Sequence, residues 1–509
     1  MIKHNKKNFL IAAFCGFVFI FSFPPHGLAP VTPLVLAAMI GLAFREKPAR
    51  VFLLWFLFGF VFNAYTLHWA GNVVKGEITL QVKAAVLTGV AALSLYMSLY
   101  QAVCGWLLSR FRTRYGKGLA LTAFPFLWTG LEYLRSLGQI SFPWTTVGYT
   151  AGVYNSFMQF SSVAGVYFYS LLICAFGSAV YTSTAVSRKR GALYGAFLIA
   201  LCVFMLIYGF AEKKRTARNI DESEAVKAGL VQTNVDLNVK WNPEFLYRVI
   251  DSNISLSRSI LPKNPDMIIW AESAVPCWFN LRRKVRDRIR DFVNESGTDL
   301  YFGSLRYEMA DKPEFYTSMM LARPQDRRIQ DYDKIKLVPF SEYLPFENYF
   351  PVLSRVDLGE ADFSFGKRMK LFETGKVLAA PFICYEIIYP SHVRKFVNKG
   401  ANLIINISND GWFGDSDMPH HHFNMAKFRA VENRRTVIRA TNTGISAIIL
   451  PDGTASHQTP LFEAAAYTGD APLFTEETVF SKAGDAAGVL AFIILIISLP
   501  AVFLKTPVS

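Results

Sequence analysis

The chain has 509 residues, of which 52% are apolar and only 18% are charged. This balance excludes an ordinary soluble protein and indicates membrane-spanning segments. The net charge of +14 could indicate nucleic-acid binding. Many basic residues, however, lie in short clusters between apolar runs, where such residues set membrane orientation. We therefore predict a membrane protein that binds no nucleic acid.

Apolar runs fill the first 212 residues, and one more lies near the C-terminus. A bilayer span needs roughly 20 residues, so we predict eight transmembrane helices, the first two of them short. The N-terminal run lacks a clear cleavage site and leads into Pro24 and Pro25, so we interpret it as a retained span rather than a signal peptide. The eight runs are about 8–23, 28–44, 51–71, 84–109, 119–135, 157–181, 191–211 and 487–504.

Lysine and arginine gather in alternate short connections between these runs. Cytoplasmic loops carry an excess of both residues, so these connections are predicted to be cytoplasmic. Seven spans within 1–212 then place residue 213 onward outside, and the span at 487–504 returns the C-terminus to the cytoplasm. The basic residues are Lys3, Lys6, Lys7, Arg45, Lys47, Arg50, Arg110, Arg112, Arg114, Lys117, Arg188, Lys189 and Arg190.

Residues 222–480 have the pattern of a water-soluble α/β domain. Short β-rich runs alternate with polar helical patterns, which favours a sheet covered by helices. The β-rich runs are 226–231, 267–270, 300–304, 316–321, 377–384, 403–408 and 437–450. The helical patterns lie near 243–260, 281–296, 391–399 and 420–434, and Pro451-Asp452-Gly453 predicts a turn.

Three residues of this domain could together transfer an acyl group. Glu272 ends an apolar strand, Lys334 lies in a polar stretch, and Cys384 ends another apolar strand. A carboxylate can take a thiol proton, a lysine can stabilise an oxyanion, and a thiolate can form a thioester. Taken singly, each residue has a simpler reading: a buried thiol, a solvated carboxylate and a surface charge. Spacing alone does not bring the three together.

The motifs around these residues resemble those of the nitrilase superfamily. They are WAES at Glu272, YDKIKLVPFSEY at Lys334 and ICYE at Cys384. The resemblance implies an αββα sandwich in which the three residues act as base, oxyanion stabiliser and nucleophile. With eight apolar runs around such a domain, the chain resembles the apolipoprotein N-acyltransferase family over nearly its whole length. Further matching segments are QTN with KW, LVPFSEYLP, SNDGWFGDS, and PHHHF leading to ATNTGISA.

The resemblance also implies roles for other residues. Glu342 matches a second essential glutamate that supports the lysine and the cysteine. Tyr385 and Glu386 follow the nucleophile and shape its surroundings, and Trp241, Trp412 and Phe413 match aromatic residues at the site entrance. Ser341 departs from the glycine expected before the second glutamate, which puts the local turn geometry in question. The apolar stretch after Glu342 (Tyr343, Leu344, Phe346, Tyr349, Phe350, Val352 and Leu353) could form a lid against lipid or pack on the sandwich.

The reaction implied by the resemblance has two steps and needs no cofactor. Cys384 takes a fatty acyl group from a phospholipid, typically phosphatidylethanolamine, as a thioester. The acyl group then passes to the α-amine of the diacylglyceryl-cysteine that begins an apolipoprotein. The resemblance places the protein in the bacterial inner membrane, with its catalytic domain on the periplasmic side. His420, His421 and His422 near Asp417 could suggest a metal, but adjacent residues diverge around a helix, so we predict none.

Two other classes of function stay open. A membrane-anchored amidase or nitrilase would use the same three residues with water as the acceptor, although a small soluble substrate needs no eight-span region. A transporter or receptor with an outer binding domain would not be an enzyme at all. Transporters usually place ionisable residues within their spans, whereas here the polar constellation lies in the soluble domain. Replacing Cys384 by alanine separates the enzymes from the non-enzymes.

Overall fold

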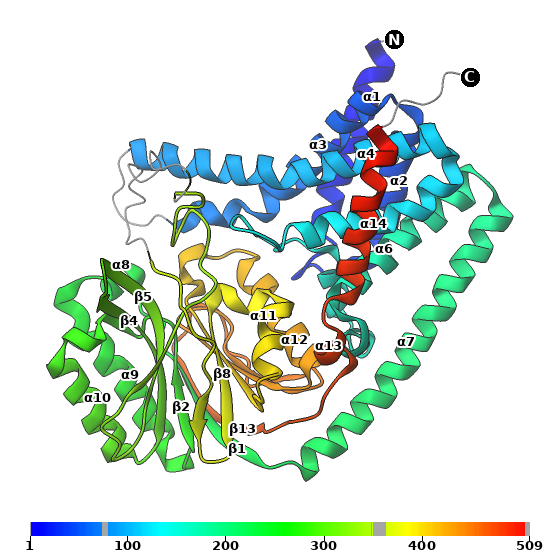
Figure 1. Ribbon diagram of the computed structural model, residues 1–509. Helices are drawn as coiled ribbons and strands as arrows, with labels where there is room; N and C mark the ends of the chain where they lie inside the picture. The colour runs from blue at the N-terminus through cyan, green and yellow to red at the C-terminus, as the bar shows by residue number, and fades with distance from the viewer. Residues whose placement is uncertain (1, 74–79, 348, 350–362, 504–509) are drawn as a thin grey trace.

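The computed structural model describes residues 2–73, 80–347, 349 and 363–503. It consists of a helical region and a two-sheet sandwich, joined by the long helix α7 (Arg188–Glu222) and by the connection to α14 (Ala486–Phe503). The chain enters and leaves the sandwich side by side, since Ala225 pairs with Pro472. Figure 1 shows both chain termini at the end of the helical region that is far from the sheets.

The helical region forms where the apolar runs lie. Its other long helices are α1 (Ile2–Ile20), α2 (Thr32–Arg45), α3 (Pro48–Thr66), α4 (Leu80–Leu134) and α6 (Ser161–Ala185). The runs at 84–109 and 119–135 both fall within α4, which is broken at Gly116, where φ is 80° and ψ is 173°. Left-handed φ values suit glycine, so this residue allows the chain to reverse between two helices.

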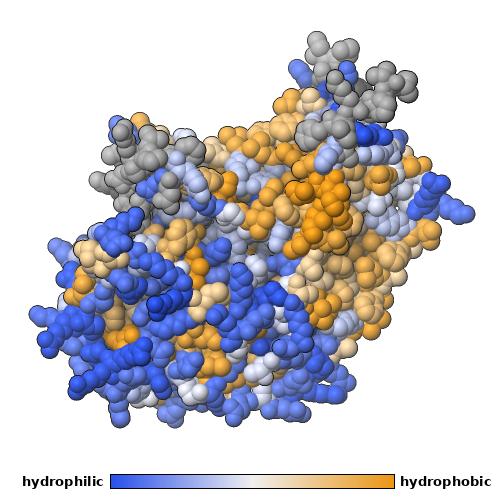
Figure 2. All heavy atoms as spheres, in the orientation of Figure 1, coloured by the Kyte–Doolittle hydropathy of each residue, from blue (hydrophilic) through white to orange (hydrophobic). Residues whose placement is uncertain are grey.

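Within the described residues, four helices are long and apolar enough to cross a membrane. They are Pro48–Thr66, Lys83–Leu134, Ser161–Ala185 and Arg188–Glu222. Ala29–Arg45 and Ala486–Pro500 are apolar but shorter. The α-helical bundle is therefore confirmed, while the count of eight spans stays a prediction. Figure 2 shows hydrophobic surface over the helices and mostly hydrophilic surface over the sandwich, the distribution expected when only the helical part contacts lipid.

The sandwich contains two mixed sheets. The first has the order β13-β1-β2-β4-β5-β6, with β3 beside β4, and the second has the order β12-β11-β10-β9-β8-β7. The strands of the first are β1 (Ala225–Gln232), β2 (Met267–Trp270), β3 (Val275–Trp278), β4 (Asp299–Met309), β5 (Pro313–Ala322), β6 (Gln330–Asp333) and β13 (Ala465–Pro472). Those of the second are β7 (Phe372–Thr374), β8 (Val377–Ile383), β9 (Leu403–Ser408), β10 (Thr436–Thr441), β11 (Ala447–Ile449) and β12 (Ala455–Ser456).

Helices cover the outer face of each sheet, so the predicted αββα sandwich is confirmed. Figure 1 shows α9 (Leu246–Ile260) and α10 (Arg283–Ser296) on the first sheet, and α11 (Pro390–Val397) and α12 (Met418–Asn433) beside the second. The central strands are parallel: β1 with β2, β2 with β4, β8 with β9, and β9 with β10. Parallel strands buried on both faces are nearly all apolar, as in the fully buried Leu403–Ser408.

The run predicted at 437–450 is two strands rather than one. The chain leaves β10 at Thr441, turns, and returns as the antiparallel β11. The turn predicted at Pro451-Asp452-Gly453 joins β11 to β12, where Leu450 N donates to Thr454 O at 2.8 Å. Strands β6 and β13 were missed in the sequence because their residues, QDYD and AAYTGDAP, lack the apolar β-branched pattern.

The helical region packs directly on α12. Asn424 Nδ2 donates to Tyr149 O at 2.9 Å, and Glu432 Oε1 accepts from Val166 N at 3.1 Å. Arg434, at the end of the helix, is fully buried and donates to Gln159 Oε1 at 2.7 Å. Buried polar groups paired in this way hold two parts in one register, so the sandwich is fixed to the helices through α12.

Candidate active site

Cys384 lies where β8 ends and the short helix η8 (Cys384–Ile388) begins. Its φ is +48°, a left-handed value that is uncommon for residues other than glycine and is found mainly where surrounding contacts impose it. The thiol is free and the residue is partly exposed, whereas Cys277 in the same sandwich is buried. The turn therefore places this residue just after the paired part of β8, which ends at Ile383.

Lys334 brings two carboxylates together beside this thiol. Its Nζ lies 2.6 Å from Glu342 Oε1 and 3.8 Å from Glu272 Oε1. Burial disfavours the charged form of Lys334, but the charges of Glu342 and Glu272 outweigh burial and raise its pKa. The lysine is therefore a cation at neutral pH although only 1% of its side chain is exposed.

Glu272 lies where the segment after β2 passes very close to the neighbouring parallel strand β4. It follows β2 and precedes Ser273, whose φ is +51°. A Cβ on Gly303 of the neighbouring β4 would lie 2.7 Å from Glu272 Cα, so only glycine allows this approach. Burial raises the pKa of Glu272, and Lys334 only partly offsets that effect. A carboxylate with a raised pKa is a better proton acceptor near neutral pH.

The thiol of Cys384 is protonated in the resting state. Burial raises its pKa to about 12, Glu272 adds to the increase, and Lys334 opposes it. A thiol of this kind cannot act as a preformed thiolate, so a base must take its proton as the sulfur attacks. Glu272 is the carboxylate whose charge acts most strongly on the thiol, and it is therefore the candidate for that base.

Glu386 joins the turn that carries the thiol to the loop that carries the lysine. Its carboxylate is fully buried and accepts from Ile383 N at 2.8 Å, Ile335 N at 2.8 Å and Lys336 N at 3.1 Å. The hydroxyl of Tyr332 also donates to it at 2.8 Å. Burial raises the pKa of Glu386, but His392 and the hydrogen bonds from Ile383 and Tyr332 outweigh burial and lower it. The carboxylate therefore stays charged and holds the two segments together.

His422 supports the nucleophile from behind, a role that the sequence did not reveal. Its Nε2 lies 3.1 Å from Cys384 O, and its Nδ1 lies 3.2 Å from Asp410 Oδ1. Arg439 donates to Asp410 Oδ2 at 2.8 Å. Burial lowers the pKa of His422, so the ring is neutral. Cys384 O and Asp410 Oδ1 are both acceptors, and a neutral ring can donate to only one of them. In the tautomer with its proton on Nε2, the ring donates to Cys384 O, and Nδ1 accepts from Arg439 Nη2 at 3.1 Å.

Of the predicted aromatic residues, Trp241 and Trp412 lie beside each other, and Phe413 contacts the helical region. The rings of Trp241 and Trp412 are 6.5 Å apart, and Phe413 packs edge-on against Trp69 at 4.8 Å. Lys240, next to Trp241, is buried and donates from Nζ to Glu272 O at 2.8 Å. Burial lowers the pKa of Lys240 to about 7. The aromatic pair is thus connected through α8 (Leu237–Lys240) to the backbone of Glu272.

Tyr385 is directed toward the helical region. Its hydroxyl donates to Ser141 O at 2.8 Å, and its ring stacks on Phe142 at 6.1 Å. The stretch after Glu342 touches the same part of the chain, because Tyr343 Oη and Phe346 N bond to Gln139. This part of the predicted lid therefore contacts the helical region, whereas Phe350, Val352 and Leu353 lie outside the described residues. Ser341, the departure from the expected glycine, is exposed.

Comparisons with known proteins match both the helical region and the sandwich. Residues 227–473 match the carbon-nitrogen hydrolase family, and residues 15–179 match the apolipoprotein N-acyltransferase N-terminal domain. An apolipoprotein N-acyltransferase from Geobacter metallireducens is 32% identical over 94% of this chain and 92% of its own. A second, from Shewanella oneidensis, is 29% identical over 91% of this chain and 90% of its own. A solved amidase from Nesterenkonia sp. is 18% identical over 48% of this chain and 90% of its own, with a TM-score of 0.37.

Proposed function

The chain belongs to the apolipoprotein N-acyltransferase family, and from that premise we propose how its own residues perform the reaction. Cys384 is the nucleophile, Glu272 the base and Lys334 the stabiliser of the oxyanion. The observation that carries this assignment is the cluster in which Lys334 Nζ lies 2.6 Å from Glu342 and 3.8 Å from Glu272, while Glu272 and Lys334 both interact electrostatically with the Cys384 thiol.

In the first step the donor is a phospholipid, and phosphatidylethanolamine is the donor we propose. Glu272 takes the proton from Cys384 Sγ as the sulfur attacks the ester carbonyl carbon. The negative charge that develops on the carbonyl oxygen lies near the ammonium of Lys334, where it is stabilised. The bond from carbon to the glycerol oxygen then breaks, Glu272 returns the proton to that oxygen, and a lysophospholipid leaves.

In the second step the acceptor is an apolipoprotein whose first residue is a diacylglyceryl-cysteine. Its neutral α-amine attacks the thioester carbonyl, and Glu272 takes a proton from the nitrogen. The carbon–sulfur bond breaks and the proton passes to the sulfur, which restores the thiol and leaves an amide. One site serves two substrates in turn, so ping-pong kinetics are expected.

Glu342, Glu386 and the aromatic residues have supporting roles in this proposal. Glu342 keeps Lys334 charged and in place, since its Oε2 also accepts from Val338 N at 2.9 Å. Glu386 holds the turn of Cys384 against the lysine loop. Trp241, Trp412 and Phe413 offer apolar surface for acyl chains between the triad and the helices.

We further propose a bacterial inner-membrane location with the sandwich on the periplasmic side. α7 begins with the basic residues Arg188, Lys189 and Arg190, and its junction with α6 lies at the same end as the two termini and away from the sheets in Figure 1. An excess of lysine and arginine is typical of cytoplasmic loops. The proposed organisation is seven spans within 1–212, a catalytic domain at 222–480 and an eighth span at 487–504.

The thioester can be tested directly by intact mass after incubation with phosphatidylethanolamine. The protein should gain one fatty acyl group, which hydroxylamine removes. Cys384→Ala should not gain it, whereas Cys202→Ala, which removes a partly exposed thiol of α7, should gain it in full. An acyl group on the Cys384→Ala protein would exclude the proposed nucleophile. Release of free fatty acid in place of transfer to the amine would favour the hydrolase alternative.

A further inference from the structure

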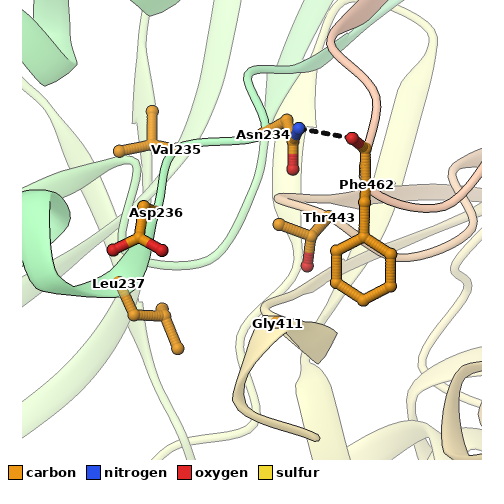
Figure 3. A pocket seen from close by; sticks show the side chains of 7 residues that line it. All are labelled: Asn234, Val235, Asp236, Leu237, Gly411, Thr443 and Phe462. Carbon is orange, nitrogen blue, oxygen red and sulfur yellow. Dashed lines mark hydrogen bonds between the residues drawn. The ribbon is translucent and has the colours of Figure 1, made fainter. Parts of the chain in front are cut away.

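A pocket of about 220 Å³ lies beside the triad and contains none of its residues. It opens where β1, β9 and β10 end, whereas Glu272 and Cys384 follow β2 and β8. Its lining residues are Asn234, Val235, Asp236, Leu237, Gly411, Thr443 and Phe462. Figure 3 shows Asp236 and Leu237 on one side, Phe462 on the other, and Thr443 between them.

Hydrogen bonds connect the segments that line this pocket. The side chain of Asn442 accepts from Val235 N at 3.1 Å and donates to Val235 O at 2.9 Å. Phe462 N donates to Thr443 O at 2.9 Å, and Asn234 Nδ2 donates to Phe462 O at 2.5 Å. Asn234 and Phe462 have φ values of +49° and +58°. Left-handed residues held in this way are concentrated at binding and catalytic sites.

Buried polar groups of the lining residue Thr443 and of Asn409, which lies next to the lining residue Gly411, have no partner among the described residues. The hydroxyl of Thr443 is buried and forms no hydrogen bond there, and the same holds for both polar atoms of the Asn409 amide. Gly411 lies close to both groups: a Cβ at this position would lie 2.7 Å from Thr443 Oγ1 and 3.4 Å from Asn409 Oδ1. Buried polar groups normally have partners, so these atoms are suited to a ligand.

The pocket is connected to the triad by two short segments. Leu237 begins α8, whose Lys240 bonds to the backbone of Glu272. Gly411 belongs to η9 (Asp410–Phe413). The first residue of η9, Asp410, contacts His422. At its last residue, the Phe413 carbonyl accepts from Asn72 of the helical region at 2.9 Å. The Phe413 end of η9 therefore faces the helices, and its Gly411 end lines the pocket.

We propose that this pocket binds the polypeptide of the acceptor just after its lipidated cysteine, an inference that rests on the proposed function. The acyl chains of that cysteine must remain on the side of the helices, so the polypeptide has to leave by another route. The exposed carboxylate of Asp236, the hydroxyl of Thr443 and the amide oxygen of Asn234 are acceptors for the backbone N–H groups of an extended chain. The ring of Phe462 adds an apolar wall.

The test compares two acceptors: a diacylglyceryl-cysteine lipopeptide with a polypeptide tail, and the diacylglyceryl-cysteine amide without one. Thr443→Val keeps the shape and removes the hydroxyl, and Asp236→Asn removes the charge. For the tailed acceptor we expect KM to rise about fivefold and about tenfold, respectively, because the first variant removes one hydrogen bond and the second removes one charge-assisted hydrogen bond. For the amide, KM should stay unchanged, as should thioester formation from phospholipid. Asn238→Ala, an exposed neighbour in α8 outside the pocket, is the matched control.

Binding without turnover gives an independent measurement. Cys384→Ala protein should bind the tailed lipopeptide more tightly than the amide, and adding Thr443→Val should remove most of that difference. Equal affinity for the two acceptors, or a KM for the tailed acceptor that both pocket variants leave unchanged, would overturn the inference. The inference would also be overturned if the pocket variants formed the thioester more slowly from phosphatidylethanolamine but not from phosphatidylglycerol. That result would identify the pocket as a binding site for the phospholipid headgroup. A normal acceptor preference with no acyl group on Cys384 would instead contradict the proposed nucleophile.

Discussion

At the scale of single residues, the chemistry depends on charged groups whose burial is energetically unfavourable. Lys334 is almost fully buried, and it stays charged only because Glu342 and Glu272 are both beside it. The same cation opposes the pKa increase of the Cys384 thiol without cancelling it. The thiol therefore depends on proton removal during attack, which makes the ionisation of Glu272 the controlling event.

The pH dependence of thioester formation follows from this ionisation. Because the pKa of Glu272 is raised above its ordinary value of 4.5, its carboxylate form is lost at a higher pH than for an exposed glutamate. The rate should therefore fall as the pH decreases through a value above 4.5. Glu272→Gln should reduce the rate at least about 100-fold and abolish this acid limb. A rate that stays constant down to pH 4.5 would show that another group is the base.

The position of Glu342 predicts a milder defect. Glu342→Gln keeps the size of the side chain but removes the charge that lies closest to Lys334. Leaving a buried ammonium with one carboxylate weakens its charged form, so kcat for acyl transfer should decrease about tenfold or more. KM for the phospholipid should change little, because the acyl chains are bound elsewhere. A change in KM alone, measured with vesicle substrate, would argue against a role in oxyanion stabilisation.

At the scale of elements, the site is assembled from the carboxyl ends of strands that lie far apart in the sequence. Apolar runs made β1, β2, β8 and β9 predictable, and the motifs placed Glu272, Lys334 and Cys384 at or near strand ends. The hydrogen-bond network of His422, Asp410 and Arg439 next to the nucleophile was not predictable, because these residues are as polar as residues on a protein surface. Only their burial, at 0% to 1% exposure, reveals that they form one network.

The hydrogen bond between His422 and the Cys384 carbonyl predicts that different substitutions of His422 reduce activity to different extents. His422→Phe removes the hydrogen bond to Cys384 O, so the left-handed turn should relax and iodoacetamide should modify Cys384 at a different rate. The rate of thioester formation should decrease about tenfold, in line with the loss of one or two buried hydrogen bonds. His422→Gln, which keeps an N–H donor, should recover part of both rates. If glutamine and phenylalanine behave alike while the melting temperature is unchanged, the hydrogen bond has no positioning role.

At the scale of the whole molecule, buried hydrogen bonds hold the helical region and the sandwich together. Tyr385, next to the nucleophile, bonds to Ser141, and Arg434 at the end of α12 bonds to Gln159. The apolar runs predicted the helical region, but not that the buried arginine and tyrosine would fix the sandwich to it. Composition cannot distinguish a charged residue that faces water from one that is buried between two parts of the protein. This interface could therefore be recognised only in the structure.

Orientation is the prediction that belongs to this scale. A cysteine introduced at the exposed Lys312 of the sandwich should react with a membrane-impermeant maleimide added outside spheroplasts. A cysteine at Lys189, in the first turn of α7, should react only after the membrane is permeabilised. The reverse pattern would place the sandwich in the cytoplasm and exclude periplasmic acceptors.

The most direct measurement isolates the acyl-enzyme. Protein loaded from radiolabelled phosphatidylethanolamine is separated from lipid and then mixed with a diacylglyceryl-cysteine lipopeptide. The account predicts that the label leaves Cys384 and appears on the α-amine of the acceptor in equal amount, with no phospholipid present. Label that stays on the protein, or that is released only as free fatty acid, would contradict acyl transfer through this thiol.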